Sequence, residues 1–376
     1  MILLSPGGTA VQRQAAPAAR LVVGTVEGIF VFERDAGRHW FPAGRALEGC
    51  FVSALTRLES GALIAATHGL GVVRSDDGGM TWRLANAGLS HFDVWVVKAE
   101  RLGGRERLFA GTLPAHLFVS EDGAASWREL TALRDVPSAP QWSFPPPPHQ
   151  GHVLDVASLG DSLYVGIEVG ALLRSDDGGK TFSELPVNPD VSEVDIHRLA
   201  LHPKRPQRII AATGWGMIAS DDRGASWRKG ERLPGIDYPI PLVAHPDDPD
   251  LLFVAGGEGW PPNWYQIGRS RAKIARSRDG GRSWQRLLGG LPDGQRPTFG
   301  GLALEAWDGG FAVLAADTDG QIYESRDGGD RWSVVAEAAP VSKGEQYRGL
   351  AKGRPPLVGT DSLVFAEAGQ RRVSQA

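Results

Sequence analysis

The chain has 376 residues, of which 42% are apolar and 22% charged, and its formal net charge is −4. This composition is typical of a globular protein with a sizeable core, and the near-neutral charge gives no electrostatic footprint for binding DNA or RNA. One cysteine, Cys50, excludes an intrachain disulfide framework and a cysteine-based zinc site. No apolar run approaches the roughly 20 residues of a membrane span, and the opening MILLSPGG is too short for a signal peptide, so we expect a cytoplasmic protein.

From the N-terminus onward, one octapeptide recurs with the pattern Ser-x-Asp-x-Gly-x-Thr/Ser-Trp. Its copies are 33–40 (degenerate), 75–82, 120–127, 175–182, 220–227, 277–284 and 325–332. The Asp carboxylate and the Ser hydroxyl can accept hydrogen bonds from backbone amides of the turn, and the glycines permit positive φ. The aromatic side chain then anchors the turn in an apolar layer. Seven near-equivalent copies cannot each be an active site, so we assign the aspartates a structural role. These are Asp35, Asp77, Asp122, Asp177, Asp222, Asp279 and Asp327.

Each copy is preceded by the same succession of short apolar runs. Residues 51–58, 62–67, 71–75 and 81–85 predict four short strands, and the same four recur at 196–201, 208–213, 217–220 and 226–230. Four-stranded units whose closing aromatics lie 42–57 residues apart predict a β-propeller. The fold class is therefore all-β.

Residues 21–40 supply only strands two to four of a first blade. The segment 361–367 resembles an innermost strand, so we expect it to complete that blade and close a ring of seven. Residues 20–367 then form one propeller domain, 1–19 a loose N-terminal tail and 368–376 a frayed C-terminal tail. The alternative is eight blades, with 11–15 as an innermost strand and the C-terminus as part of an eighth blade.

The repeats resemble the Asp-box (BNR) repeats of the sialidase-like propellers over roughly residues 20–335. That group includes sialidases, xyloglucanases, sortilin-type receptors and photosystem assembly factors, so the resemblance implies the fold and leaves the function open. Sialidases carry Arg-Ile-Pro in the first blade, and this chain has no such tripeptide. A xyloglucanase site lies between two propellers, and only one is expected here.

The resemblance also implies two different faces. One carries the turns between strands two and three and the connections between blades; we call it the loop face. The Asp boxes lie on the opposite face. Two long insertions, 131–152 and 256–273, fall on the loop face, and loops of this length are usually functional. Alternatively, they cap the channel or form a dimer contact.

Several histidines fall in the same loops. We expect His68, His116 and His152, together with Glu168, to be candidate catalytic residues and candidate ligands of a divalent metal, because neutral imidazole is a common metal ligand. There is no HExxH motif, and the alternative is a set of hydrogen-bonded surface histidines.

A second set of loop-face residues suits ligand binding. Exposed aromatic rings on a concave face suit sugars or other flat ligands, guanidinium groups bind carboxylate or phosphate, and paired acids serve hydrolysis. The candidates are Trp215, Trp260, Trp264, Tyr265, Arg269, Arg271, Arg296, Asp317 and Asp319. A turn alone also explains the two aspartates.

Three functions follow from these candidates. The first is a propeller that binds a small, sugar-like molecule or a protein partner through its loop face. The second is a hydrolase or lyase, with or without a divalent metal, that uses the His/Glu cluster. The third is an assembly or scaffold protein.

Overall fold

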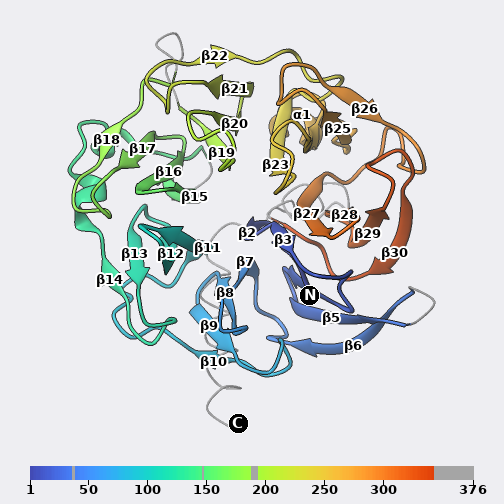
Figure 1. Ribbon diagram of the computed structural model, residues 1–376, viewed down its shortest axis with the longest axis horizontal. Helices are drawn as coiled ribbons and strands as arrows, with labels where there is room; N and C mark the ends of the chain where they lie inside the picture. The colour runs from blue at the N-terminus through green and yellow to red at the C-terminus, as the bar shows by residue number, and fades with distance from the viewer. Residues whose placement is uncertain (36–38, 146–147, 188–193, 343–376) are drawn as a thin grey trace.

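The computed structural model describes residues 1–35, 39–145, 148–187 and 194–342. In this part of the protein, seven sheets surround a central axis (Figure 1). Each blade has four strands ordered from the axis to the rim, and two of the sheets gain a short fifth strand at the axis. The expected seven-bladed, all-β propeller is confirmed.

The strands follow one another blade by blade. Blade 1 contains β1 (Ile2–Leu4), β4 (Arg20–Thr25), β5 (Gly28–Arg34) and β6 (Trp40–Ala46). Blade 2 contains β7 (Val52–Arg57), β8 (Leu63–Thr67), β9 (Gly71–Ser75) and β10 (Arg83–Leu84). Blade 3 contains β11 (Val94–Leu102), β12 (Arg105–Thr112), β13 (Leu117–Ser120) and β14 (Arg128–Glu129). Blade 4 contains β15 (His152–Leu159), β16 (Ser162–Glu168), β17 (Leu172–Ser175) and β18 (Ser183–Glu184).

Blade 5 contains β19 (Ile196–Leu201), β20 (Ile209–Thr213), β21 (Gly216–Ser220) and β22 (Arg228–Lys229). Blade 6 contains β23 (Tyr238–Ala244), β24 (Leu252–Gly257), β25 (Lys273–Ser277) and β26 (Gln285–Leu287). Blade 7 contains β27 (Phe299–Trp307), β28 (Gly310–Asp317), β29 (Gln321–Ser325) and β30 (Ser333–Glu337). The first insertion forms two 3-10 turns, η1 (Thr131–Arg134) and η2 (Ala139–Gln141), and the second contains the helix α1 (Pro261–Ile267).

The first blade is completed from the N-terminus. Strand β1 pairs in parallel with β4, and the side chains of Ile2, Leu3 and Leu4 are fully buried. Residues 1–19 are therefore not a loose tail, and the expectation that residues 361–367 supply the innermost strand is wrong, because β1 occupies that position. The segment 361–367 itself lies outside the described residues.

The polypeptide then crosses the central channel. Strand β2 (Gly7–Gly8) pairs in parallel with β7 of blade 2, and β3 (Val11–Arg13) pairs in parallel with β27 of blade 7. Both lie at the centre of the ring in Figure 1. From the other side of the channel, the guanidinium of Arg198 donates to the carbonyl of Pro6. We call residues 5–13 the plug, because they occupy the axis of the propeller.

The core lies between neighbouring blades. In one cluster, for example, Phe109 and Leu117 of blade 3 pack with Val153 and Ile167 of blade 4. Since each sheet buries both faces against its neighbours, the inner strands are apolar almost throughout, and the ring must close for either end to be buried.

The Asp boxes form the turns between the third and fourth strands. In blade 4, Asp177 accepts hydrogen bonds from the amides of Lys180 and Thr181, both at 3.0 Å, and from the hydroxyls of Thr181 at 2.6 Å and Ser175 at 2.8 Å. These donors, the Thr181 hydroxyl foremost, hold the pKa of Asp177 far below its usual range. The degenerate box keeps a shorter version, in which Asp35 accepts from the amide of His39 at 2.8 Å.

Arginines link one blade to the box of the next. Arg20, Arg74, Arg174 and Arg276 each donate to the carbonyl of the residue that follows the box aspartate in the neighbouring blade. The acceptors are the carbonyls of Gly78 at 3.2 Å, Gly123 at 2.6 Å, Arg223 at 3.4 Å and Gly328 at 2.5 Å. Arginine suits this repeated contact better than lysine does, because the guanidinium fork can bond a carbonyl and a neighbouring side chain at once.

Candidate functional site at the channel mouth

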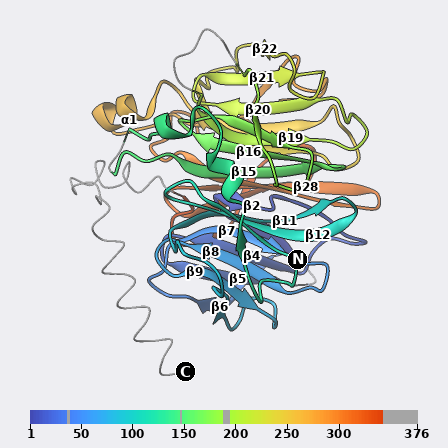
Figure 2. The same cartoon turned by 90° about the vertical axis from the view of Figure 1, so that its left-hand side faces the viewer.

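The two insertions lie on one face of the disc. In Figure 2, α1 stands out from the left-hand side of the propeller. The inner strands of blades 2 to 7 begin at this face, and each has a register shift within its first residues. A β-bulge turns a side chain away from the regular alternation of the strand. Around the mouth of the channel, these bulges therefore change the direction in which the first side chains of the inner strands point.

Two of the four predicted catalytic and metal residues lie in direct contact. His152 and Glu168 face each other in the β15–β16 ladder, and His152 Nε2 lies 2.6 Å from Glu168 Oε2. Both residues are buried. The structure therefore brings this pair together at the inner end of blade 4.

The other two histidines lie elsewhere. The indole of Trp95 separates His68 from His152, with ring centroids 4.6 Å and 3.8 Å away, and His68 Nδ1 faces Asp93 at 3.5 Å. His116 binds Glu129 at 2.7 Å and lies in another part of the loop face. The four residues therefore do not converge on one point.

Two residues that the sequence motifs did not single out complete the cluster. Ligand atoms of Glu168, Asp195 and His197 all lie within 4.8 Å of one another. His197 is the residue at the bulge of β19; its Nδ1 lies 2.6 Å from the carbonyl of Pro239, and its Nε2 lies 3.3 Å from Asp195 Oδ2. Burial alone would lower the pKa of His197, but the charge of Asp195 and the hydrogen bonds outweigh it and raise the pKa.

The predicted aromatic residues differ in their exposure. Trp264 is buried and donates its indole N–H to the carbonyl of Glu258 at 2.7 Å, while Trp215 is half-buried against the core of blades 4 and 5. Trp260, at the start of α1, is 60% exposed. Tyr265 lies within α1, and its side chain is outside the described part of the structure.

The predicted arginines and aspartates lie near blades 6 and 7. Arg296 binds both carboxylate oxygens of Asp319, and Arg271 lies 3.4 Å from Glu258. Arg269 is exposed and forms no ion pair with any residue that the structure describes. Of the three guanidinium groups, that of Arg269 is therefore the one available to a ligand.

Asp317 is buried in the turn between β28 and β29, where backbone amides bind its carboxylate. It accepts the amides of Asp319 at 2.9 Å and Gln321 at 3.0 Å, and the Tyr323 hydroxyl lies 3.3 Å away. Burial raises the pKa of Asp317 to about 6. Asp317 and Asp319 thus shape the turn between β28 and β29 and bind different partners.

The described part of the structure has hollows on both faces and in the channel. A groove of about 340 Å³ follows the first insertion and is lined by His116, Arg134, Trp142 and Gln150. A cavity of about 350 Å³ lies beside the plug in the channel.

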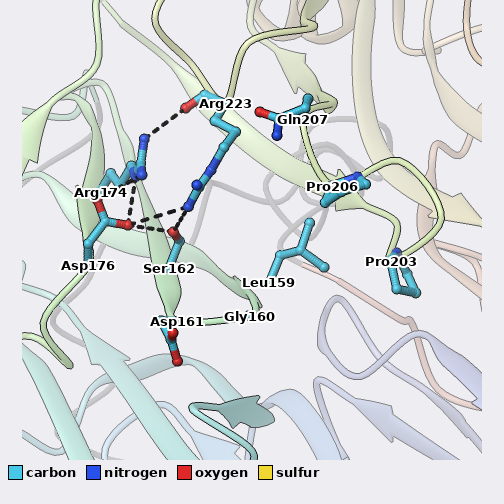
Figure 3. A pocket seen from close by; sticks show the side chains of 10 residues that line it. All are labelled: Leu159, Gly160, Asp161, Ser162, Arg174, Asp176, Pro203, Pro206, Gln207 and Arg223. Atoms are coloured by element: carbon cyan, nitrogen blue, oxygen red, sulfur yellow. Dashed lines mark hydrogen bonds and ion pairs between the residues drawn. The ribbon is translucent and has the colours of Figure 1, made fainter.

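A wider hollow of about 700 Å³ lies on the Asp-box face, between blades 4 and 5 (Figure 3). Within it, Arg174 contacts Asp176 at 2.7 Å and Arg223 donates to the Ser162 hydroxyl at 2.5 Å. Arg223 has φ of 61°, at a box position where the other five complete copies have glycine. No motif in the sequence predicted this hollow.

Comparisons with known proteins agree with this architecture. A family model described as Sortilin-Vps10 (sortilin, neurotensin receptor 3) matches residues 170–294. The protein is a seven-bladed β-propeller with Asp-containing turns between its third and fourth strands. The photosystem II assembly lipoprotein Ycf48 of Synechococcus sp. (strain CC9902) is 22% identical over 269 residues, which are 69% of this chain and 68% of that protein.

Solved structures show the same fold at low identity. An ancestral GH74 enzyme superposes with a TM-score of 0.60 and 16% identity, over 76% of this chain and 39% of that enzyme. The propeller therefore spans well under half of that enzyme. Ycf48 bound to a D1 peptide superposes with a TM-score of 0.52 and 15% identity, over 84% of this chain and 90% of Ycf48. Saccharomyces cerevisiae Sqt1 superposes with a TM-score of 0.55 and 11% identity, over 90% of this chain and 89% of Sqt1. Within the described ranges, no helix is long and apolar enough to cross a membrane.

Proposed function

We propose that this propeller binds a polypeptide partner through its loop face, at the surface formed by Trp260, Ile267 and Arg269, which we call the α1 surface. The observation that carries the proposal is the exposure of two large apolar side chains on one projecting element: Trp260 is 60% and Ile267 52% exposed. Clustered exposed apolar groups mark interaction sites more often than isolated ones do, and tryptophan and arginine dominate binding energies at interfaces.

The chemistry of the α1 surface favours a particular kind of segment. Trp260 and Ile267 suit an apolar side chain, and Arg269, which has no ion pair among the described residues, suits a carboxylate. The partner is therefore a peptide segment with a large apolar residue next to an acidic residue or next to a free C-terminal carboxylate. The Ycf48 structure with a D1 peptide supports this proposal, because it shows that a propeller of this fold binds a peptide.

Photo-crosslinking tests this proposal. A photoreactive phenylalanine analogue replaces Trp260 in the full-length protein, and the matched control carries the same group at Met80, which is also exposed but lies in the box of blade 2. We expect a discrete protein adduct from position 260, absent from position 80, and loss of that partner's binding in the Arg269→Ala variant. Equal adducts at both positions, or none at 260, would overturn the proposal.

The remaining expectations are tested separately. A small-molecule ligand would fit the groove of about 340 Å³ beside His116, and its binding would be lost in Trp142→Ala while crosslinking at position 260 persisted. A cytoplasmic location stays a prediction, which fractionation of the source cells would check.

A further inference from the structure

We propose that Glu168, Asp195 and His197 form a binding site for one divalent transition-metal ion, with Zn²⁺ as the reference cation. The site lies at the loop-face mouth of the channel, between blades 4 and 5. It is separate from the α1 surface, and nothing in the proposed partner binding requires it.

The ligand set and spacing suit such an ion. One imidazole and two carboxylates are ligands that zinc accepts at about 2.0–2.2 Å, so two atoms bound to the same ion lie roughly 3–4 Å apart. Asp195 Oδ2 and His197 Nε2 are already 3.3 Å apart, and all three ligand atoms fall within 4.8 Å. Only small side-chain movements are needed for the three to bind one ion.

The surroundings of each ligand hold it in place. The Nδ1 atom of His197 lies 2.6 Å from the carbonyl of Pro239, and this hydrogen bond leaves Nε2 between Asp195 Oδ2 at 3.3 Å and the Tyr238 hydroxyl at 3.1 Å. His152 contacts Glu168 at 2.6 Å. Metal-binding histidines commonly donate their second ring nitrogen to a carbonyl, and ligating carboxylates are themselves hydrogen-bonded, so these contacts are the ones expected around a bound metal.

The bulge in β19 supplies an independent argument. The register shift between Ile196 and Arg198 turns His197 out of the regular alternation and toward blade 6. Opposite the cluster, Gly214 leaves room for the carboxylate, because a Cβ there would lie 2.1 Å from Asp195 Oδ2. Bulges are common beside functional sites, where they direct one side chain.

Asp195 also has an unfilled requirement. Its Oδ1 atom is buried and has no hydrogen-bond donor among the described residues. A buried carboxylate oxygen without a donor destabilises the folded protein, and a cation that binds Oδ1 as well as Oδ2 of Asp195 would remove the penalty. Three protein ligands would leave at least one coordination position open to water or to a partner's carboxylate.

The test measures metal binding by the untagged full-length protein. The protein is stripped with a chelator and dialysed to equilibrium against buffered free Zn²⁺, and bound metal is counted by plasma mass spectrometry. We expect about one Zn²⁺ per molecule, and an affinity at least about tenfold weaker in Asp195→Asn, which keeps the size of the side chain. The matched control His116→Ala removes a loop-face histidine that has its own partner, Glu129, and should bind zinc as the wild type does.

A second measurement separates a lost site from a lost fold. Zn²⁺ should raise the melting temperature of the wild type and of His116→Ala but not that of Asp195→Asn, because a ligand that binds only the folded state stabilises it. Wild-type protein that binds well under one equivalent, or Asp195→Asn that binds as tightly as the wild type, overturns the proposal. Equal competition by Ca²⁺, which prefers six to eight oxygen ligands, would exclude His197 as a ligand and overturn it too.

Discussion

The N-terminal strand makes a quantitative prediction about ring closure. Successive residues of β1 face opposite sides: Leu3 packs into the cluster between blades 1 and 2, while Ile2 and Leu4 pack into the cluster between blades 7 and 1. Each leucine is fully buried. Leu3→Ala should therefore lower the free energy of unfolding by about 2–5 kcal/mol, the range for a leucine truncated in a packed core.

Urea unfolding followed by tryptophan fluorescence measures this effect. The matched control is Val11→Ala in β3, which is only half-buried beside β27 and should lower the free energy of unfolding by less than about 1 kcal/mol. Equal small effects of the two substitutions would contradict the result that β1 completes the first blade. A large change in the slope with denaturant would instead indicate that the transition is no longer two-state.

Three further substitutions test the scaffold. Arg276→Lys should lower the free energy of unfolding by about 1–3 kcal/mol. Arg276 is buried and binds the Gly328 carbonyl, Asp330 at 2.7 Å and Gln285 at 2.9 Å. The control Arg83→Lys lies on the surface and should change the free energy of unfolding little. Asp177→Ala should lower the urea midpoint, and an unchanged midpoint would refute the assignment of the box aspartates to turn formation. The stability that a box aspartate contributes should be present above about pH 4 and lost as the pH falls through its folded pKa, which for Asp222 is lowered to about 2 by the Ser226 hydroxyl and amide. Asp317→Asn should gain stability relative to the wild type as the pH rises from about 4 to 6. The folded pKa of Asp317 is raised to about 6, so its protonated form stabilises the folded wild type fully below the unfolded pKa near 4, and this stabilisation is lost as the pH rises through the folded pKa. Parallel pH profiles of the two proteins would contradict this prediction.

The repeats could be predicted because their signals are local. A Ser-x-Asp-x-Gly turn closes on itself within a few residues, as Asp177 does, so its geometry is encoded where it occurs. Strand β1 has no such signal: three apolar residues pair in parallel with β4, about 19 positions later in the sequence, without a hairpin between them. The pairing depends on the closed ring, and the sequence pattern alone favoured the C-terminal segment.

The candidate site was predicted only in part for a related reason. His152 and Glu168 lie in neighbouring strands of one blade, so the register of a hairpin brings them together. Asp195 and His197 join them from the next blade through a bulge, which the local sequence does not announce. Comparison of equivalent positions would have helped, since His152 and His197 both lie at the start of an inner strand in successive blades.

The plug makes a nearly symmetric ring unequal around its axis. Strand β1 forms the inner edge of blade 1, and β2 and β3 cover the inner edges of blades 2 and 7. The inner edges of blades 3 to 6 are left to face the cavity beside the plug, which Lys98, Asp155 and Arg198 line. The cluster of Glu168, Asp195 and His197 lies at the loop-face end of two of these blades. A ligand that enters from the loop face would therefore meet the side of the channel that the plug leaves open.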